Sequence, residues 1–128
     1  MTLWQMTILG HLPSLKNSRI GVVQRRPGRK ARALSLPSAE ARLWRQKAEL
    51  VLAAGRMRPL MQGAINLTVH VWYRSARSDL DVSLLMDTLQ GYVYENDRQV
   101  VQLHAFKGVD PKNPRVRVLV CGPSEEGT

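Results

Sequence analysis

The residues of this chain most suited to chemistry are carboxylates, because half of its 10 acidic residues lie in one short stretch: Asp79, Asp81, Asp87, Glu95 and Asp97. The chain as a whole is basic, with 19 Lys and Arg residues and a formal net charge of +9. Carboxylates held close together repel one another unless a positive charge lies between them. Hard oxygen ligands at this density suit Mg²⁺ or Mn²⁺, and a basic surface around them suits a polyanionic substrate. The combination predicts a metal-dependent nuclease.

Length and composition limit the class of protein. At 128 residues the chain is long enough for one domain with an ordinary core, without disulfides or structural metal. Its single cysteine, Cys121, cannot form an internal disulfide, and residues 1–10 have no basic segment before their apolar residues. No apolar run approaches the roughly 18 residues of a membrane span. We therefore expect a cytoplasmic protein that binds nucleic acid and has no membrane partner.

A strand followed by a helix positions the first acids. Apolar and polar residues alternate over residues 65–73, which predicts a half-buried strand. Leucines at helical spacing over residues 80–89 then predict a short helix that ends at Gly91. Asp79 and Asp81 are therefore expected at a strand-to-helix junction.

The rest of the pattern predicts three more strands and one more helix. Short apolar alternations at residues 4–8, 101–105 and 116–120 favour strands, and turn residues between the last two favour a hairpin. A helix is expected from Pro37 to about Ala54, with these residues on its buried side: Leu43, Trp44, Leu50, Val51 and Ala54. The order predicts an α+β fold, a single mixed, mostly antiparallel sheet of about four strands with two helices packed on it. Residues 1–122 would form this one domain, and residues 123–128 a loose tail.

The spacing of Asp79 and Asp81 has two interpretations. In an extended backbone both side chains point to the same face and could share one metal ion, while Leu80 points into the core. Alternatively, Ser78 caps the helix that follows, and the two aspartates lie in its first turn, where the helix dipole stabilises them. Residue types alone leave both interpretations open.

A second charged feature is the basic segment within residues 19–33. It contains charges, Pro27 and Gly28 but no apolar period, which predicts a loop without packed structure. Repulsion among its cations is least where phosphates separate them, so we expect these residues to contact DNA: Arg25, Arg26, Arg29, Lys30 and Arg32. Phosphate contacts carry no sequence information, so this segment predicts no sequence preference.

The acidic segment also has a recognisable order. Asp79-Leu80-Asp81 is followed by an apolar helix, by the turn Asp87-Thr88-Leu89-Gln90-Gly91 and by residues 93–101, VYENDRQVV. This order strongly resembles the RusA family of phage-type Holliday junction resolvases, in which a DLDN segment and a helix precede a Y-E-D-D-x-Q-hydrophobic stretch. Pro13-Ser14, Ser38-Ala39-Glu40 and residues 104–107 and 113–116 are similar to the family as well. The resemblance covers nearly the whole chain.

The resemblance implies both a site and a reaction. It places the family's catalytic and metal-binding carboxylates on Asp79, Asp81 and Asp97. It implies hydrolysis that depends on Mg²⁺, with Mn²⁺ as an alternative ion and no small-molecule cofactor. The products implied are a 5′-phosphate and a 3′-hydroxyl. It also implies a symmetric homodimer that acts on four-way junctions and other branched DNA in recombination and repair, because resolution needs two opposed nicks. The setting would be a bacterial or phage-infected cell.

Two residues depart from the family's pattern. Val82 replaces the family's Asn, and Leu85 stands where the family has a lysine. If positive charge is still needed beside the leaving oxygen, the candidates are Arg77, Arg98 and Lys107. Arg77 and Lys107 are also expected to contact DNA.

A non-catalytic DNA- or RNA-binding module remains the alternative function. In that case the acidic cluster is structural, and the acids cap a helix and balance charge. Cleavage that depends on a metal ion separates the two hypotheses.

The expected dimer contact is a patch of apolar residues around Tyr92, Val93 and Phe106.

Overall fold

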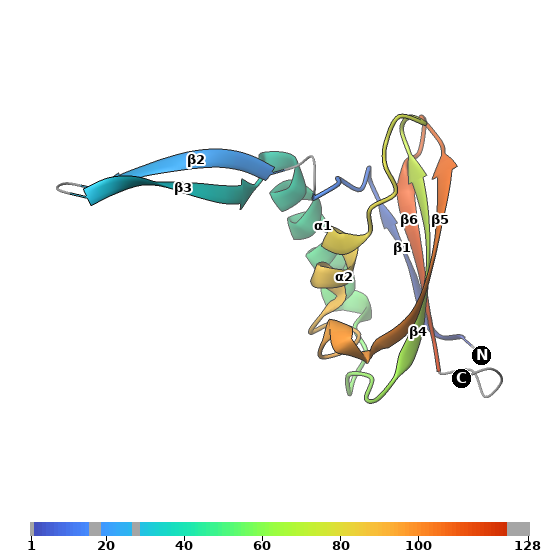
Figure 1. The fold of residues 1–128 in the computed structure, drawn as a ribbon. Helices are drawn as coiled ribbons and strands as arrows, with labels where there is room; N and C mark the ends of the chain where they lie inside the picture. The colour runs from blue at the N-terminus through green and yellow to red at the C-terminus, as the bar shows by residue number, and fades with distance from the viewer. Residues whose placement is uncertain (1, 16–18, 27–28, 123–128) are drawn as a thin grey trace.

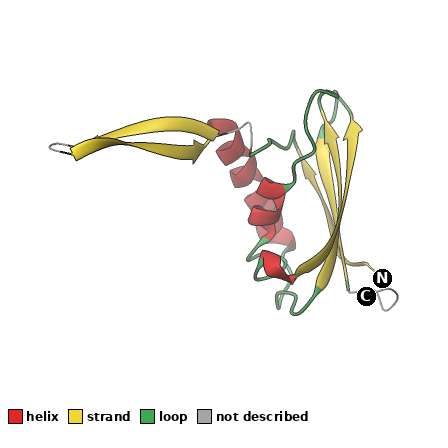
Figure 2. Cartoon of the chain, in the orientation of Figure 1, coloured by secondary structure: helices red, strands yellow, loops and turns green. Residues whose placement is uncertain are grey.

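The protein, seen in a computed structural model, has one four-stranded mixed sheet with two helices on one face. The structure describes residues 2–15, 19–26 and 29–122, and the side chains of residues 19–37 lie outside that description. The strands β1 (Thr2–Leu9), β4 (Ile65–Tyr73), β5 (Val100–Val109) and β6 (Arg115–Cys121) lie in the order β1-β6-β4-β5 (Figure 1). The helices α1 (Ala39–Gly55) and α2 (Ser83–Leu89) lie together on the same side of this sheet (Figure 2). The predicted α+β fold class is confirmed.

The central strand β4 positions the rest of the sheet. Its residues alternate strictly between buried and half-buried, from Ile65 to Tyr73, as the sequence predicts. It pairs with β6 in antiparallel and with β5 in parallel orientation. The buried row of β4 packs toward the helices, so the other row, which includes His70 and Trp72, lies on the face without helices.

The expected hairpin between the last two strands is wrong. The turn before Arg115 does connect β5 to β6, but β4 lies between these two strands in the sheet. A parallel pair needs a crossover connection, and the segment with α2 and the short 3-10 helix η1 (Asp97–Gln99) supplies it between β4 and β5. The acidic segment is therefore this crossover.

The expected basic loop is instead a two-stranded ribbon. β2 (Arg19–Arg26) and β3 (Arg29–Pro37) pair with each other in antiparallel orientation, and the ribbon extends away from the sheet and helices (Figure 1). The register pairs Ile20 with Leu36 and Val22 with Leu34. These residues have good strand propensity, which the charges near the turn obscure in the sequence. The predicted loose tail, residues 123–128, lies outside the described residues.

Helix α1 begins where the sequence predicts but presents a different face. The Ala41 N–H donates to the Ser38 hydroxyl, which caps the helix. Its buried residues are Ala41, Trp44, Ala48 and Leu52, whereas Leu43, Leu50 and Val51 are exposed. Two alanines in the buried stripe let the helix approach the sheet closely, and the large apolar residues beside the stripe remain outside it. Among the described residues no helix is long and apolar enough to cross a membrane.

Two leucines on α1 test this corrected face. Leu52 is 0% exposed and Leu50 is 76% exposed. We expect Leu52→Ala to lower the free energy of unfolding by about 2–5 kcal/mol, because it removes buried apolar contacts and leaves a cavity. Leu50→Ala is the matched control and should change it by less than about 0.5 kcal/mol. Urea denaturation measures both, and equal effects would contradict the helix orientation.

Candidate active site

Asp79 and Asp81, which with Leu80 we call the DxD segment, lie between β4 and α2, as predicted, but their surroundings differ. Asp81 is half-buried, and both of its carboxylate oxygens accept hydrogen bonds. Oδ2 accepts from the Ser14 hydroxyl at 2.9 Å and from the Leu15 N–H at 3.0 Å. Oδ1 accepts from the Ser83 hydroxyl at 2.6 Å and from the Ser83 N–H at 3.0 Å. Asp79 is exposed.

Neither sequence interpretation of this segment is fully correct. Helix α2 begins at Ser83 and Ser78 does not cap it, so the aspartates lie before its first turn. Leu80 is 40% exposed and does not anchor the segment in the core. The anchor is Asp81 itself, through the bonds that its carboxylate accepts.

Tyr73, at the end of β4, forms a hydrogen bond with the backbone of this segment. Its hydroxyl accepts a hydrogen bond from the Asp81 N–H at 3.1 Å. Burial raises the pKa of Tyr73, and the nearby charges of Asp81 and Asp79 raise it further. The phenol is therefore neutral and its oxygen is a fixed acceptor at physiological pH.

A small pocket opens beside Asp79. It measures about 190 Å³ and is lined by His11, Leu12, Pro13, Ser14, Glu40, Tyr73, Ser78 and Asp79. His11 packs edge-on against Tyr73, and its Nδ1 accepts a hydrogen bond from the Arg74 N–H at 3.2 Å. Burial and the Arg74 charge lower the pKa of His11, so the neutral ring carries its proton on Nε2.

The third predicted carboxylate, Asp97, has a different set of partners. The hydroxyl of buried Tyr94 lies 2.8 Å from Asp97 Oδ1 and 3.2 Å from the Met86 carbonyl, and its single proton goes to the closer, charged acceptor. Burial and the charges of Asp97 and Asp87 strongly raise the pKa of Tyr94. The Asp97 N–H donates to Gln90 Oε1 at 3.0 Å. Asp97 is thus fixed beside α2 near Asp87.

Gln99 and Asn96 shape the loop that carries Asp97. Gln99 Oε1 accepts from the N–H groups of Glu95 and Asn96, at 2.9 and 3.0 Å. Its Nε2 donates to the Met61 and Gly63 carbonyls, at 2.8 and 3.0 Å. Asn96 Oδ1 accepts from the Arg98 N–H at 2.8 Å and caps η1. The residues NDRQ therefore encode a rigid turn, which holds the Asp97 backbone in place.

The acids form two pairs, each beside a buried tyrosine. Asp79 and Asp81 lie near Tyr73, whereas Asp87 and Asp97 lie near Tyr94. Within the described residues no group of three His, Cys, Asp or Glu side chains is placed to hold one metal ion. The structure thus keeps Asp97 apart from a three-ligand site with Asp79 and Asp81. The donor chemistry still fits Mg²⁺, which proteins commonly bind through one or two carboxylates plus waters and substrate phosphates.

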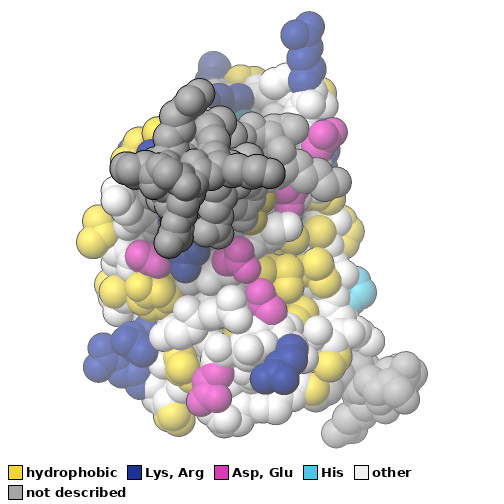
Figure 3. All heavy atoms as spheres, turned by 60° about the vertical axis from the view of Figure 1, so that its left-hand side comes forward, with side chains coloured by type: hydrophobic (Ala, Val, Ile, Leu, Met, Phe, Trp, Pro, Cys, Tyr) yellow, Lys and Arg dark blue, Asp and Glu magenta, His cyan; other side chains and the backbone are white. Residues whose placement is uncertain are grey.

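The predicted basic residues lie around this region or outside the described side chains. Lys107 Nζ donates to the Ala76 carbonyl at 2.8 Å, and Arg77 is exposed in the same loop before Asp79. Arg98 Nε donates to Asn96 Oδ1 at 3.3 Å, beside Asp97. Figure 3 shows the helix-bearing side, where separate acidic side chains stand among apolar and basic ones. The side chains of the following residues lie outside the described ones: Arg25, Arg26, Arg29, Lys30 and Arg32.

Sequence reasoning missed the groups that hold Asp81 and line the pocket. The sequence shows Tyr73 only as part of the alternating segment 65–73, and no motif marks His11. Pro13-Ser14 and Ser38-Ala39-Glu40 did carry a signal, because both segments are similar to the family. The structure places Ser14 and Glu40 at the same pocket as Asp79.

Two comparisons with known proteins bear on this site. The family model described as Endodeoxyribonuclease RusA matches residues 20–121, which include every aspartate discussed above. No curated protein matches the chain.

The different surroundings of the two DxD aspartates lead to a stability prediction. Asp81→Asn should lower the free energy of unfolding by about 1–3 kcal/mol, because an amide NH₂ cannot accept the bonds that one carboxylate oxygen accepts now. Asp79→Asn is the matched control and should change it by less than about 0.5 kcal/mol, because Asp79 is exposed. Urea denaturation without metal ions measures both. A large effect of Asp79→Asn alone would reverse the two roles.

Proposed function

The chain belongs to the RusA endodeoxyribonuclease family, and from this premise we propose that it is a Mg²⁺-dependent endonuclease that resolves Holliday junctions and other branched DNA by paired nicks, in recombination and repair. The family acts on branched DNA, and this chain's high positive charge suits that polyanionic substrate. The observation that carries the proposal is the DxD segment itself. It combines an exposed carboxylate, Asp79, with a neighbouring carboxylate, Asp81, that the fold holds rigidly.

The residues of the site have separate tasks in this proposal. Asp79 offers its carboxylate at the surface, and Asp81 is the second oxygen donor. Asp97 is the third proposed catalytic acid, but among the described residues it is not placed to share one metal ion with the other two. Rigid placement matters because a ligand that is already oriented loses little entropy when it binds. A bound Mg²⁺ would supply a water of lowered pKa and neutralise charge on the scissile phosphate.

Positive charge near the site comes from residues other than the family's lysine. Leu85 occupies that position and is fully buried in the core. Arg77 lies in the loop that leads into the DxD segment, and Lys107 contacts the same loop, since it donates to the carbonyl of Ala76. We propose that these two residues contact the DNA backbone next to the cleaved bond.

A homodimer would supply the second incision. Each chain has one DxD segment, whereas separation of a four-way junction needs two opposed nicks. Of the apolar patch expected at the contact, Val93 is fully buried and cannot take part, Tyr92 is half-buried and Phe106 is exposed. Val93 therefore cannot form part of the interface, whereas the side chains of Tyr92 and Phe106 are accessible to a partner.

Cleavage of a synthetic four-way junction tests the proposal. We expect cutting with Mg²⁺ and none with a chelator, and we expect Asp79→Asn to slow cutting at least about 100-fold, as loss of a group that stabilises developing charge does. Junction binding should remain or become tighter, because a negative charge is removed. Glu49→Gln on α1 removes the same charge next to Arg45 and is the matched control.

Two further readouts distinguish the alternatives. Linear product from a cruciform plasmid, and a mass of about twice the monomer by light scattering at micromolar concentration, would support paired nicks by a dimer. Binding that is equal with Mg²⁺ and chelator, without any cutting, would favour the non-catalytic binding module and overturn the proposed function.

The ribbon of β2 and β3 should determine affinity and its dependence on salt. Replacing Arg25, Arg26, Arg29 and Lys30 with Gln should flatten the plot of log affinity against log salt by roughly 0.9 per lost phosphate contact on duplex arms. Arg45→Gln, on the exposed side of α1, is the control for the loss of a positive charge outside the ribbon. An unchanged slope would show that the ribbon does not contact DNA.

A further inference from the structure

The face of the sheet opposite the helices is uncovered and carries a row of aromatic and basic side chains. α1 and α2 both lie on the other face (Figure 2). The register places His70 of β4 between Arg117 of β6 and Phe106 of β5, and Trp72 between Arg115 and Gly108. We call the following residues the outer face: Gln5, His70, Trp72, Phe106, Arg115 and Arg117.

Trp72 is held rigidly at the centre of the outer face. The His70 ring stacks on the indole at 3.8 Å between centroids and 10° between planes. The Arg115 guanidinium lies 4.0 Å from the indole centroid. Gly108 gives the indole room, because a Cβ there would lie 2.7 Å from Trp72 Cδ1. The aromatic surface is therefore fixed before any ligand arrives.

Arg115 and Arg117 differ in their partners, and this difference assigns them different tasks. Arg115 forms an ion pair with Asp110 Oδ2 at 2.9 Å and donates to the Asn113 carbonyl at 3.0 Å, and these bonds fix its guanidinium against Trp72. Arg117 is exposed, and its polar contact is with the neutral Gln5 Oε1 at 3.4 Å. Among the described residues Arg117 has no carboxylate partner. Its positive charge is thus available to an anion.

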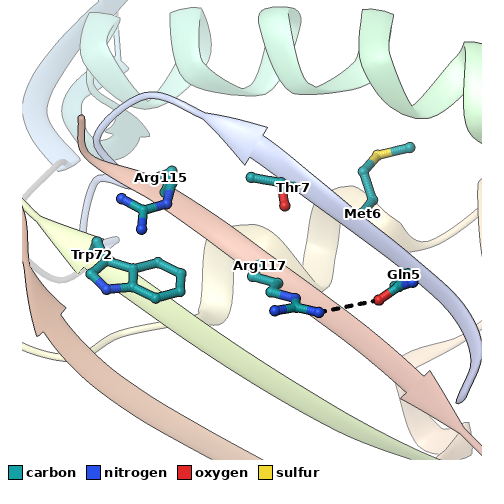
Figure 4. A pocket seen from close by; sticks show the side chains of 6 residues that line it. All are labelled: Gln5, Met6, Thr7, Trp72, Arg115 and Arg117. Atoms are coloured by element: carbon teal, nitrogen blue, oxygen red, sulfur yellow. Dashed lines mark hydrogen bonds between the residues drawn. The ribbon is translucent and has the colours of Figure 1, made fainter.

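A shallow pocket of about 540 Å³ opens on this face, lined by Gln5, Met6, Thr7, Trp72, Arg115 and Arg117. Figure 4 shows Arg117 between Trp72 and Gln5, with Thr7 beside it. The lining offers an indole, two guanidinium groups, an amide and a hydroxyl. An aromatic surface next to a phosphate-binding cation is the combination that proteins use for unpaired nucleotides, since every base has a π-face that can stack.

We infer that the outer face binds single-stranded DNA, with a phosphate at Arg117 and a base against the exposed Phe106 ring and the adjoining His70 ring, because His70 and the Arg115 guanidinium already cover the two faces of the Trp72 indole. The inference rests on the proposed function in taking DNA as the polyanion. Duplex DNA fits less well, because its base faces are covered by stacking. A second copy of the chain in a symmetric contact fits less well too, because it would bring Arg117 of both copies to the same basic patch.

Trp72 provides a local signal for the test. Trp4 and Trp44 are 9% and 6% exposed, whereas Trp72 is half-buried at the surface. Oligothymidylate of about 12 nucleotides, within the usual site size of single-strand binding folds, is titrated with a chelator present so that no cutting occurs. We expect quenching of tryptophan emission, and we expect Trp72→Phe to lack it.

Arg117→Gln tests the phosphate contact while the indole remains in place. We expect it to weaken oligothymidylate binding, followed by Trp72 emission, by about tenfold, which is within the range for one lost contact of this kind. Arg45→Gln removes the same charge from α1 and should leave the affinity within about twofold. Because Arg117→Gln keeps Trp72, the test does not depend on the folding of Trp72→Phe.

Several outcomes would overturn the inference. These are no quenching in the wild-type protein, quenching that Arg117→Gln leaves unchanged, or equal quenching by a duplex of the same length. An emission change that follows protein concentration without DNA would assign the face to a second copy. Junction cleavage by the same preparation keeps the two proposals apart. Cutting without quenching contradicts only this inference, and quenching without cutting contradicts only the proposed function.

Discussion

The site depends on the hydrogen bonds that the Asp81 carboxylate accepts. This carboxylate accepts hydrogen bonds from Ser14 and Leu15, after β1, and from Ser83, at the start of α2. The backbone N–H of Asp81 also donates to the Tyr73 hydroxyl at the end of β4. Three parts of the chain that are distant in sequence therefore meet at one side chain. A charged acceptor forms stronger hydrogen bonds than a neutral one, so a carboxylate suits this junction better than an amide or a hydroxyl. The same charge also makes Asp81 an oxygen donor for a cation.

These two roles of Asp81, holding the fold together and offering oxygen atoms to a cation, explain why the neighbouring Asp79 is exposed. A carboxylate whose oxygens already accept several hydrogen bonds must exchange some of them to bind a metal ion, whereas an exposed carboxylate exchanges only water. As proposed metal ligands, Asp79 and Asp81 therefore combine an accessible carboxylate with a rigid one. The second pair follows the same rule, because Tyr94 and Gln90 fix Asp97 while Asp87 lies near the same phenol. In both pairs a neutral tyrosine separates the acids from the core.

The sequence predicted the elements with a strong local period and missed those decided by contacts distant in the chain. The alternation of β4 and the Ser38 cap of α1 are local, and both are confirmed. The partner of β5 depends on the crossover through α2, which no local pattern encodes. The buried face of α1 was missed because Ala41 and Ala48, which pack closely, carry a weaker signal than Leu50. The position of Asp97 depends on Tyr94 and Gln90, whose role appears only in three dimensions.

Because the helices cover only one face of the sheet, the carboxylates near α2 and the cations of the outer face lie on opposite sides of it. The acids proposed for catalysis lie on the side of α2, and there they oppose the approach of a phosphate backbone unless cations offset their charge. The uncovered face has Arg117 without a carboxylate partner among the described residues, and its nearby Asp110 is already paired with Arg115. Phosphate can therefore approach this face without a metal ion. DNA would thus meet two sites with opposite requirements: the carboxylates near α2 need divalent cations to accept it, whereas Arg117 competes with those cations for the same phosphates.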